Sequence, residues 1–436
     1  MAHRRGDDED DDDADREERE RCAHDRVGDP PPEARLGLAG ILIPIVTIAA
    51  SLTLLPAILA IMGPWINRWR VVPQRVLDQP ESRFWRRVAN AIMRAPAISL
   101  AIGLLIIGVI AAPARDLVLG ASPVSTVPNV GPGVTGTKLL EQAFGSGGST
   151  PVRVVVDAPA SALATLPATL GARPGVVAVE VTQSPRRADV SLVSVLGRGA
   201  IGSTEADRLV SHLRHDYLPA ALPAGATFLV GGGPAVFADF QEALYGDSWM
   251  IALIVVLVTY VVLFRAFRSV LQPLKAVLIN VLSVAGDYGL LVLFFQHDAG
   301  GLSPFVHVPV IAVWIPLFLF SFLYGLSMDY EVFLLSRMRE EVDLGVGNAE
   351  AVATGLAKTG KLVTSAALIM VIAFGGLATS RFVEMQEFGF GLAAAILLDA
   401  TVIRALIVPS LMQLMGRWNW WLPAWAERFA GRGLQH

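Results

Sequence analysis

Seven apolar segments constrain this 436-residue chain more than any other feature of its sequence. Each is long enough to cross a bilayer, which takes about 20 residues of α-helix. Because a backbone in lipid must satisfy its own hydrogen bonds, apolar segments of this length predict helices. The sequence therefore predicts a polytopic α-helical membrane protein. Its helices are expected at 36–62, 94–113, 248–264, 269–296, 308–335, 362–380 and 388–414, the last five forming a bundle over 248–416.

The stretch 114–247, between the second and third apolar segments, reads as a water-soluble domain. Its hydrophobic pattern alternates between the strand period of 2 and the helix period of 3.6. The resulting βαββαβ order is that of a ferredoxin-like, porter-type α+β domain, a fold that does not by itself indicate a function. Strands are expected at 151–157, 175–182, 189–196 and 226–231, and helices at 160–170 and 203–217.

Charged residues amount to 17% of the chain, against about 25% in soluble domains. Acidic residues crowd into 1–35, and this segment is expected to be a disordered tail because dense like charges oppose collapse. Short loops rich in arginine and lysine favour the cytoplasm. This rule predicts a multi-pass plasma-membrane protein with a basic cytoplasmic loop at 63–93, helix 94–113, an extracytoplasmic domain at 114–247 and a cytoplasmic tail at 417–436. The acidic tail also carries arginines, so its side is left open.

Several function classes have no support in the sequence. The chain has a single cysteine, Cys22, and no cluster of Cys and His with metal-ligand spacing. The glycines at 231–233 lack the lysine and the serine or threonine of a phosphate loop. Basic and tryptophan residues in 63–93 indicate contact with lipid head groups rather than nucleic acid. We therefore expect no enzyme activity, no metal and no nucleic-acid partner, and the lipid bilayer as the main partner.

Asp329 is the strongest candidate for a functional residue. It lies in GLSMDYEVFLLSRMREE (325–341), about six residues before the helix leaves the apolar zone and so roughly 9 Å deep. Ionisable side chains inside a membrane are costly and by default indicate function. Low dielectric favours the neutral form of a carboxyl group, so such an acid can accept a proton on one side and release it on the other. Tyr330 is a candidate hydrogen-bond partner; the alternative is a structural role for Asp329 between helices.

Two more polar pairs lie in apolar segments. Asp287 and Tyr288 are interpreted either as an added protonatable pair or as tolerated polar residues facing a wet cavity. Asp399 and Arg404 are five positions apart, about 140° around an α-helix, and are not expected to pair with each other. Each is expected to meet a partner on another helix, with a proton path as the alternative. The polar residues Asn280 and Ser283 are expected to bridge helices.

The segment containing Asp329 and Tyr330 resembles the tenth transmembrane helix of the MmpL branch of the RND superfamily. Other segments resemble further helices of that family, and the resemblance runs from about residue 36 to about residue 425. Asp287 departs from the family pattern, which usually has small apolar residues before that tyrosine. The matching segments are SLTLLPAILAIMG (51–63), VGGGPAVFADF (230–240), LVTSAALIMVIAFGG (362–376) and FGFGLAAAILLDATVIRALIVPSLMQLMG (388–416).

This resemblance implies a transporter driven by the proton motive force that exports lipids or other amphipathic compounds. It assigns Asp329 and Tyr330 to a proton relay, with protons as coupling ion and no other cofactor. Complete family members have two similar halves, and this chain resembles the carboxyl-terminal one, from the equivalent of helix 6 to helix 12. A partial or split form is therefore expected, with a first-half polypeptide or a homo-oligomer as partner. The alternative is a non-transporting remnant or an interaction subunit that pairs with another membrane protein.

Overall fold

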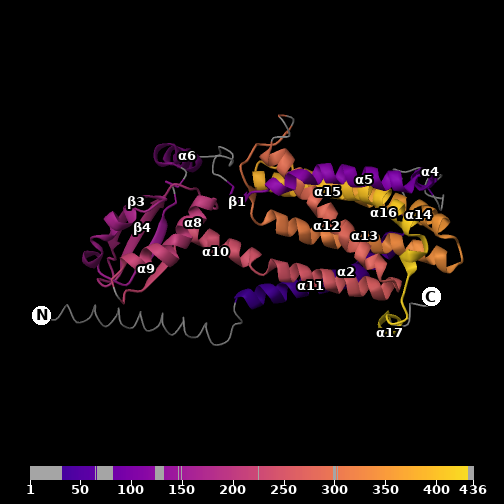
Figure 1. Ribbon diagram of the computed structural model, residues 1–436, viewed down its shortest axis with the longest axis horizontal. Helices are drawn as coiled ribbons and strands as arrows, with labels where there is room; N and C mark the ends of the chain where they lie inside the picture. Colours follow the sequence, from indigo (N-terminus) through magenta and orange to yellow (C-terminus); the bar gives the residue numbers. More distant parts are fainter. Residues whose placement is uncertain are drawn as a thin grey trace. The chain divides into compact units, whose positions relative to one another are not determined.

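The computed structural model describes residues 32–63, 65, 82–122, 132–145, 147–148, 150–223, 225–297, 301 and 303–430 (Figure 1). The chain divides into two compact units, Met1–Gln79 and Pro80–His436. The predicted acidic tail lies outside the described residues except for 32–35, which are already helical. Most of the predicted loop at 63–93 and the end of the predicted tail at 417–436 also lie outside them.

The first unit contains helix α2 (Pro32–Met62). Nearly all of its described side chains are exposed within this unit, although they are apolar. Lipid tails are as apolar as leucine, so a membrane helix does not need protein to cover such side chains. Pro44 and Pro56 lie inside α2, which membrane helices tolerate.

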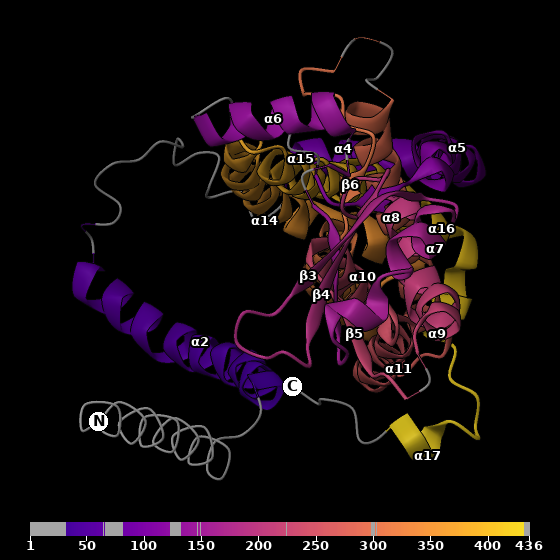
Figure 2. The ribbon, with the colours of Figure 1, turned by 90° about the vertical axis from the view of Figure 1, so that its left-hand side faces the viewer.

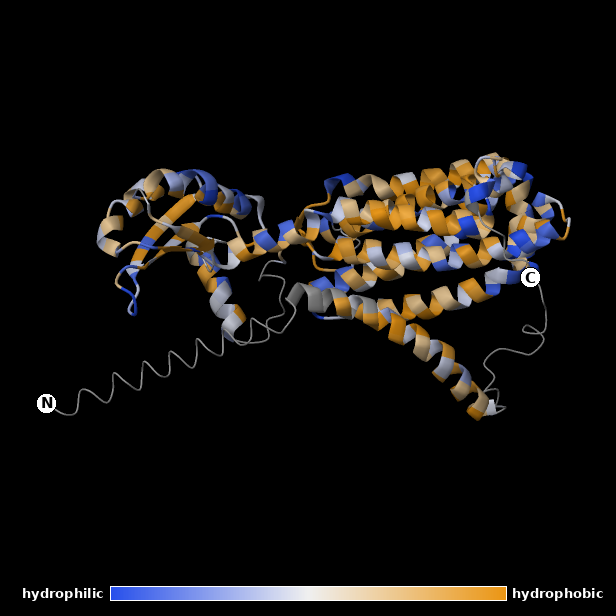
Figure 3. Ribbon diagram, turned by 90° about the horizontal axis from the view of Figure 1, so that it is seen from below, coloured by the Kyte–Doolittle hydropathy of each residue, from blue (hydrophilic) through white to orange (hydrophobic). Residues whose placement is uncertain are grey.

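The prediction of seven membrane helices is confirmed, since the described residues contain seven helices long and apolar enough to cross a bilayer. The six in the second unit are hydrophobic along most of their length (Figure 3). They comprise α5 and η2 (Pro96–Ala111, Ala112–Asp116), α10 and α11 (Gly233–Tyr245, Ser248–Phe267), α12 and η6 (Leu271–Leu291, Val292–Gln296), α13 (Ile315–Asp343), α14 (Asn348–Leu377), and the run of α15, η8, α16 and η9 (Val383–Leu398, Asp399–Ile407, Val408–Met415, Gly416–Trp420), which α17 (Glu427–Ala430) follows.

Two helical stretches were not predicted from the apolar segments: helix α4 (Arg83–Arg94) and the first turns of α14. Helix α4 lies within the predicted loop at 63–93, where Ser82 caps its first turn. The first turns of α14 lie before 362 and carry polar residues on one side, while their other side buries Ala351–Ala353 and Leu356. Trp85 of α4 packs against Gly360 of α14, where a side chain would collide with the indole ring. Amphipathic turns that pack on another helix are missed by a search for continuous apolar segments.

The domain between α5 and α10 is the expected ferredoxin-like unit. Its strands are antiparallel in the order β3-β4-β2-β5, with Val154 opposite Val193 and Val230. Helices α7, α8 and α9 lie on one side of the strands (Figure 2), where Leu209 and Leu213 join the buried core. The elements are α6 (Pro132–Phe144), β2 (Val152–Val156), η4 (Ala160–Leu163), α7 (Leu166–Gly171), β3 (Val176–Gln183), β4 (Ser191–Gly197), α8 (Thr204–His212), η5 (Leu213–Tyr217), α9 (Leu218–Ala221) and β5 (Phe228–Gly231).

Two short strands that the sequence does not predict connect segments far apart in the chain. Strand β1 (Leu119–Gly120) pairs in parallel with β6 (Ile311–Ala312), which directly precedes α13. Next to this pair, the Tyr245 hydroxyl of α10 donates a hydrogen bond to the Val313 carbonyl at 2.7 Å. Two-residue strands have no detectable periodicity, and only their pairing identifies them.

Helix α12 packs closely against the end of α5 at Gly289. A Cβ atom there would overlap the Ile110 carbonyl oxygen and lie 2.9 Å from the Ala111 Cα. Both obstacles are backbone atoms, so a side-chain rotation cannot relieve the clash. Gly289 therefore sets the distance between α12 and α5, on which the position of the α12 core residues depends.

Gly289→Ala should lower the free energy of unfolding by about 1–3 kcal/mol, the usual cost of overpacking. The matched control is Gly108→Ala, because Gly108 also lies inside a membrane helix but has open space around it. Thermal unfolding of both variants in detergent measures the difference. Equal unfolding temperatures for the two variants would contradict the close α12–α5 contact.

Candidate functional site

Asp329 lies in the middle of α13 and is exposed on the surface of the unit. Tyr330 points about 100° away around the helix and is half-buried. Its hydroxyl donates to the Met370 sulfur of α14 at 3.6 Å, so the structure gives it a different partner from Asp329. The Arg404 guanidinium lies 4.7 Å from the centroid of the Tyr330 ring. The two residues of the pair thus connect α13 to different surroundings.

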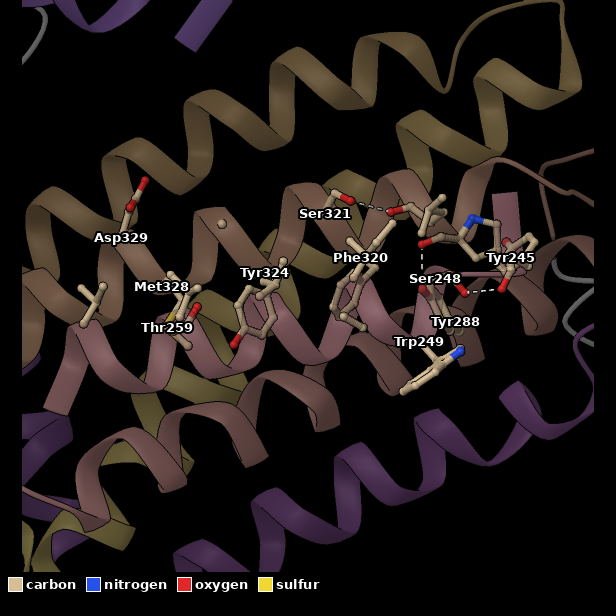
Figure 4. A pocket seen from close by; sticks show the side chains of 18 of the residues that line it. Tyr245, Ser248, Trp249, Thr259, Tyr288, Phe320, Ser321, Tyr324, Met328 and Asp329 are labelled. Carbon is tan, nitrogen blue, oxygen red and sulfur yellow. Dashed lines mark hydrogen bonds between the residues drawn. The ribbon is translucent and has the colours of Figure 1, made fainter. Parts of the chain in front are cut away.

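A groove of about 710 Å³ runs between α11 and α13, and Asp329 lies at one end of it (Figure 4). Tyr245, Ser248 and Trp249 line the opposite end. Between the two ends the lining is mainly aliphatic and aromatic, as expected for a pocket that takes apolar ligands. Hydroxyl groups interrupt it at Thr259, Ser321 and Tyr324. The groove therefore combines a long apolar wall with a polar group at each end.

Asp399 and Arg404 pair directly, so the expectation that they do not is wrong. The Arg404 Nε atom donates to Asp399 Oδ2 at 2.8 Å, and Nη2 lies 2.6 Å from the same oxygen. The reason is that η8 is a π-helix, whose hydrogen bonds join residues five apart. Two residues five apart, which diverge on an α-helix, are one turn apart on a π-helix.

The Asp399–Arg404 pair is buried and connects η8 to α13 through Ser327. The Ser327 hydroxyl donates to Asp399 Oδ1 at 3.0 Å, and Arg404 Nη2 donates to the Ser327 carbonyl at 2.8 Å. These bonds compensate the two buried charges. Removing one partner of a buried pair leaves the other charge uncompensated, which is strongly destabilising. The expectation that each residue meets another helix is therefore confirmed, alongside their pairing with each other.

Asp287 and Tyr288 face different surroundings. The Tyr288 hydroxyl donates to the Pro316 carbonyl at 2.6 Å, and its ring lines the groove. The Asp287 side chain has no exposed surface, and neither of its carboxyl oxygens has a hydrogen-bond partner among the described residues. Asp287 and Tyr288 are adjacent in the sequence but have no common partner in the structure.

Sequence reasoning missed three buried ionisable residues. Glu331 follows the Asp329–Tyr330 pair but is buried, and so is Lys275 of α12. The Lys275 ammonium lies 3.0 Å from the Met412 sulfur. Glu387 of α15 accepts a hydrogen bond from the Ala312 N–H of β6 at 3.2 Å. Their positions near the ends of apolar segments made them look like ordinary flanking charges.

Metal binding has no support in the described part of the chain. Those residues contain no group of three or more His, Cys, Asp or Glu side chains that could hold a metal ion. The site itself offers carboxyl and hydroxyl groups, which can transfer protons, and a guanidinium, which keeps its charge.

Comparisons of the sequence with known proteins identify related proteins. The sequence model of the MMPL family matches residues 35–99 and 149–432, which include all six predicted site residues. The chain is 33% identical over 413 residues to the mycolic acid-containing lipids exporter MmpL11 of Mycolicibacterium smegmatis, covering 90% of this chain and 42% of that protein.

Two proteins of Mycobacterium tuberculosis are similarly related. The heme uptake protein MmpL11 is 34% identical over 406 residues, covering 89% of this chain and 41% of that protein. The trehalose monomycolate exporter MmpL3 is 30% identical over 425 residues, covering 88% of this chain and 44% of that protein. The chain therefore spans less than half the length of each of these relatives.

Arg404→Met should destabilise the bundle by about 3–5 kcal/mol, because it leaves the Asp399 carboxylate buried without its partner. The double variant with Asp399→Leu should recover a large part of that loss, because it removes the uncompensated charge. Thermal unfolding of the wild type, both single variants and the double variant in detergent forms the necessary cycle. Purely additive losses would show that the two residues do not interact.

Proposed function

The chain belongs to the MMPL family, and we propose that it forms the proton-coupled part of a transporter that exports lipids or other amphipathic compounds. The predicted family and the predicted fold, membrane helices with a porter-type domain, are both confirmed. The observation that carries the proposal is the groove between α11 and α13, which ends at the intramembrane carboxyl group of Asp329. It brings a place for an apolar chain and a protonatable group together on one helix.

The shape of the groove supports an amphipathic substrate. Its wall is apolar over most of its length, while Tyr245, Ser248 and Trp249 offer hydroxyl and indole groups at one end. An acyl chain would lie along the wall and a polar head group would lie at that end. Relatives are named as exporters of mycolic acid-containing lipids and of trehalose monomycolate. Another is named for heme uptake, so the printed names do not select one compound.

Proton coupling is supported by the position of Asp329. A carboxyl group inside the membrane is costly in its charged form, so it takes up or releases a proton when its surroundings change. Inward movement of one charge across 100 mV supplies about 2.3 kcal/mol. Tyr330 touches both α14 and the Arg404 guanidinium. In this proposal it transmits the charge state of Asp329 to the buried network of Asp399, Arg404 and Ser327.

The proposed orientation places the porter-type domain outside the plasma membrane. Basic residues gather where α13 meets α14, including Arg337, Arg339 and Lys358. This end should therefore face the cytoplasm, together with the residues that follow α16. The porter-type domain precedes α11 at the opposite end of the membrane helices and would receive the substrate there.

Asp329 also favours a partner in the membrane. Its carboxyl group is exposed on the surface of its unit, and an ionisable side chain facing lipid is unfavourable. We propose that a first-half polypeptide or a second copy of the chain covers this face. The alternative function, a non-transporting interaction subunit, uses the same face for docking to another membrane protein. Transport measurements on Asp329 variants separate the two.

Asp329→Asn should abolish proton-coupled export without reducing the amount of protein in the membrane, because an amide cannot exchange a proton. The control is Asp343→Asn on the same helix, where the carboxylate forms an exposed pair with Arg339, which contributes little to stability. Export of a labelled lipid and proton influx are measured in vesicles that contain the chain with any partner it requires. Unchanged export by Asp329→Asn would exclude the relay and favour the alternative.

Gly325→Phe should weaken binding of a fluorescent fatty-acyl probe about 10-fold, or about 1.4 kcal/mol. The new ring would occupy the groove, which Gly325 lines and where a Cβ atom has open space. Gly108→Phe on α5 is the matched control, because its surroundings are also open and it lies outside the groove. Titration of the purified variants measures the affinities, and equal values would show that the probe binds elsewhere.

A further inference from the structure

A row of buried polar side chains runs along one face of α12. Asn280, Ser283 and Asp287 are spaced by three and four residues and therefore share a face. Their residue exposures are only 2%, 3% and 0%. Both polar atoms of the Asn280 side chain and both carboxyl oxygens of Asp287 lack partners among the described residues. An unpaired buried polar group is unfavourable, so each of these needs an explanation.

A small cavity explains Asn280. It has a volume of about 10 Å³ and is lined by Asn280 and Ser283 of α12, Ser327 of α13 and Asp399 of η8, among others. This is close to the smallest cavity that admits one water molecule, and such a water needs two to four polar partners. The four polar side chains supply them. One water molecule here would join the α12 row to the Asp399–Arg404 pair.

Asp287 lies one helical turn from Ser283 on the same face of α12, a rise of about 6 Å. It forms no ion pair within the described residues. The nearest cation along α12, Lys275, is about 18 Å away by helix rise and lies beside Met412. An isolated carboxylate in such a place is very unfavourable, so Asp287 holds its proton. The other titratable or charged groups on α12 and on the elements packed against it are Tyr288 of α12, Arg115 and Asp116 of η2, Tyr260 and Arg265 of α11, Tyr324, Asp329, Tyr330, Glu331, Arg337, Arg339, Glu340, Glu341 and Asp343 of α13, Glu384 and Glu387 of α15, Asp399 and Arg404 of η8, and Arg417 of η9. Tyr245 of α10 lines the groove together with Tyr288.

The row is separate from the Asp329 site. Ser327 and Asp329 are two residues apart on α13 and so face directions about 200° apart. Ser327 is buried against η8, whereas Asp329 is exposed at the groove. A proton on the α12 row therefore lies on the opposite side of α13 from a proton on Asp329.

We infer that Asp287 is a second proton-binding site of this chain, which exchanges its proton with the Asp399–Arg404 pair through water held by Asn280 and Ser283. The inference rests on the proposed function and deepens it by adding an interior route to the relay at Asp329.

The exchange moves a proton and changes no other covalent bond. Ser283 lines the cavity and Asp287 does not, so the Ser283 hydroxyl has to carry the proton between them. The O–H bond of the Asp287 carboxyl breaks as a new one forms on the Ser283 hydroxyl, which passes its own proton to the bridging water. A proton leaves that water for Asp399 Oδ1, so the water is restored and the total charge of the row is unchanged. Arg404 keeps its hydrogen bond to the Ser327 carbonyl and its contact with the Tyr330 ring. Asp287 then recovers a proton by the reverse transfer.

Infrared spectroscopy of the purified full chain tests the protonation of Asp287, because a protonated carboxyl has its own C=O stretching band. At neutral pH the wild type with isotope-labelled aspartate should show this band with the isotope shift. Asp287→Asn with the same label should lack the shifted band, and Glu387→Gln should retain it. If Asp287→Asn does not fold, isotope-labelled aspartate in Asp329→Asn identifies the band instead. A wild type without the band, or a band that persists in Asp287→Asn, would overturn the inference.

Exchange in heavy water tests the route. The Asp287 band should shift on transfer to heavy water, and Asn280→Leu, which fills the cavity, should slow that shift about 10-fold. Thr401→Val is the control, since Thr401 is exposed on η8 and its hydroxyl donates to the Leu397 carbonyl within its own helix. A band that never shifts, or equal rates in Asn280→Leu and Thr401→Val, would mean a static acid with no route. These spectra require no transport, so failure of the Asp329 relay would be seen separately in the export assay.

Discussion

The pairing of Arg404 with Asp399 inside a π-helical segment is the interaction on which the rest of the bundle depends. An unpaired charge at this depth would be strongly unfavourable, and the pair exists because η8 brings residues five apart onto one face. Its bonds to Ser327 hold α13 against η8. The position of α13 in turn places Tyr330 on Arg404 and directs Asp329 to the opposite side. A local change of helix type thus sets the geometry of the whole site.

Helix α13 separates two environments that serve different purposes in the proposed transporter. One side faces the apolar groove, which is lined by Asp329 and by side chains of α11 and α13 and which would hold the lipid-like substrate. The other side faces a closed interior, in which Ser327 meets the polar residues of α12 and η8. Movement of α13 would affect both sides at once, because the helix is continuous from Ile315 to Asp343. Coupling between substrate and proton therefore needs no long pathway.

Much of the architecture could be predicted from the sequence because single segments carry its signals. The seven apolar segments and the alternating strands of the porter-type domain are both properties of continuous stretches, and both are confirmed. Helix α4 and the first turns of α14 were not predicted, because they are apolar on one side only. Such a side is recognised as a buried face only when the helix that covers it is known. The same holds for β1 and β6, which exist only as a pair.

The sequence by itself determined that this chain spans the membrane, that it carries a ferredoxin-like domain, and that Asp329, Asp287 and Asp399 stand in apolar helices. Composition and periodicity suffice for these conclusions, because lipid leaves the backbone few choices. Only the tertiary structure decided what each acid meets: Asp399 an arginine, Asp329 an open groove, and Asp287 a closed interior without a partner. Those differences arise from the π-helical register of η8 and from the packing of α12 against its neighbours, which no single segment contains.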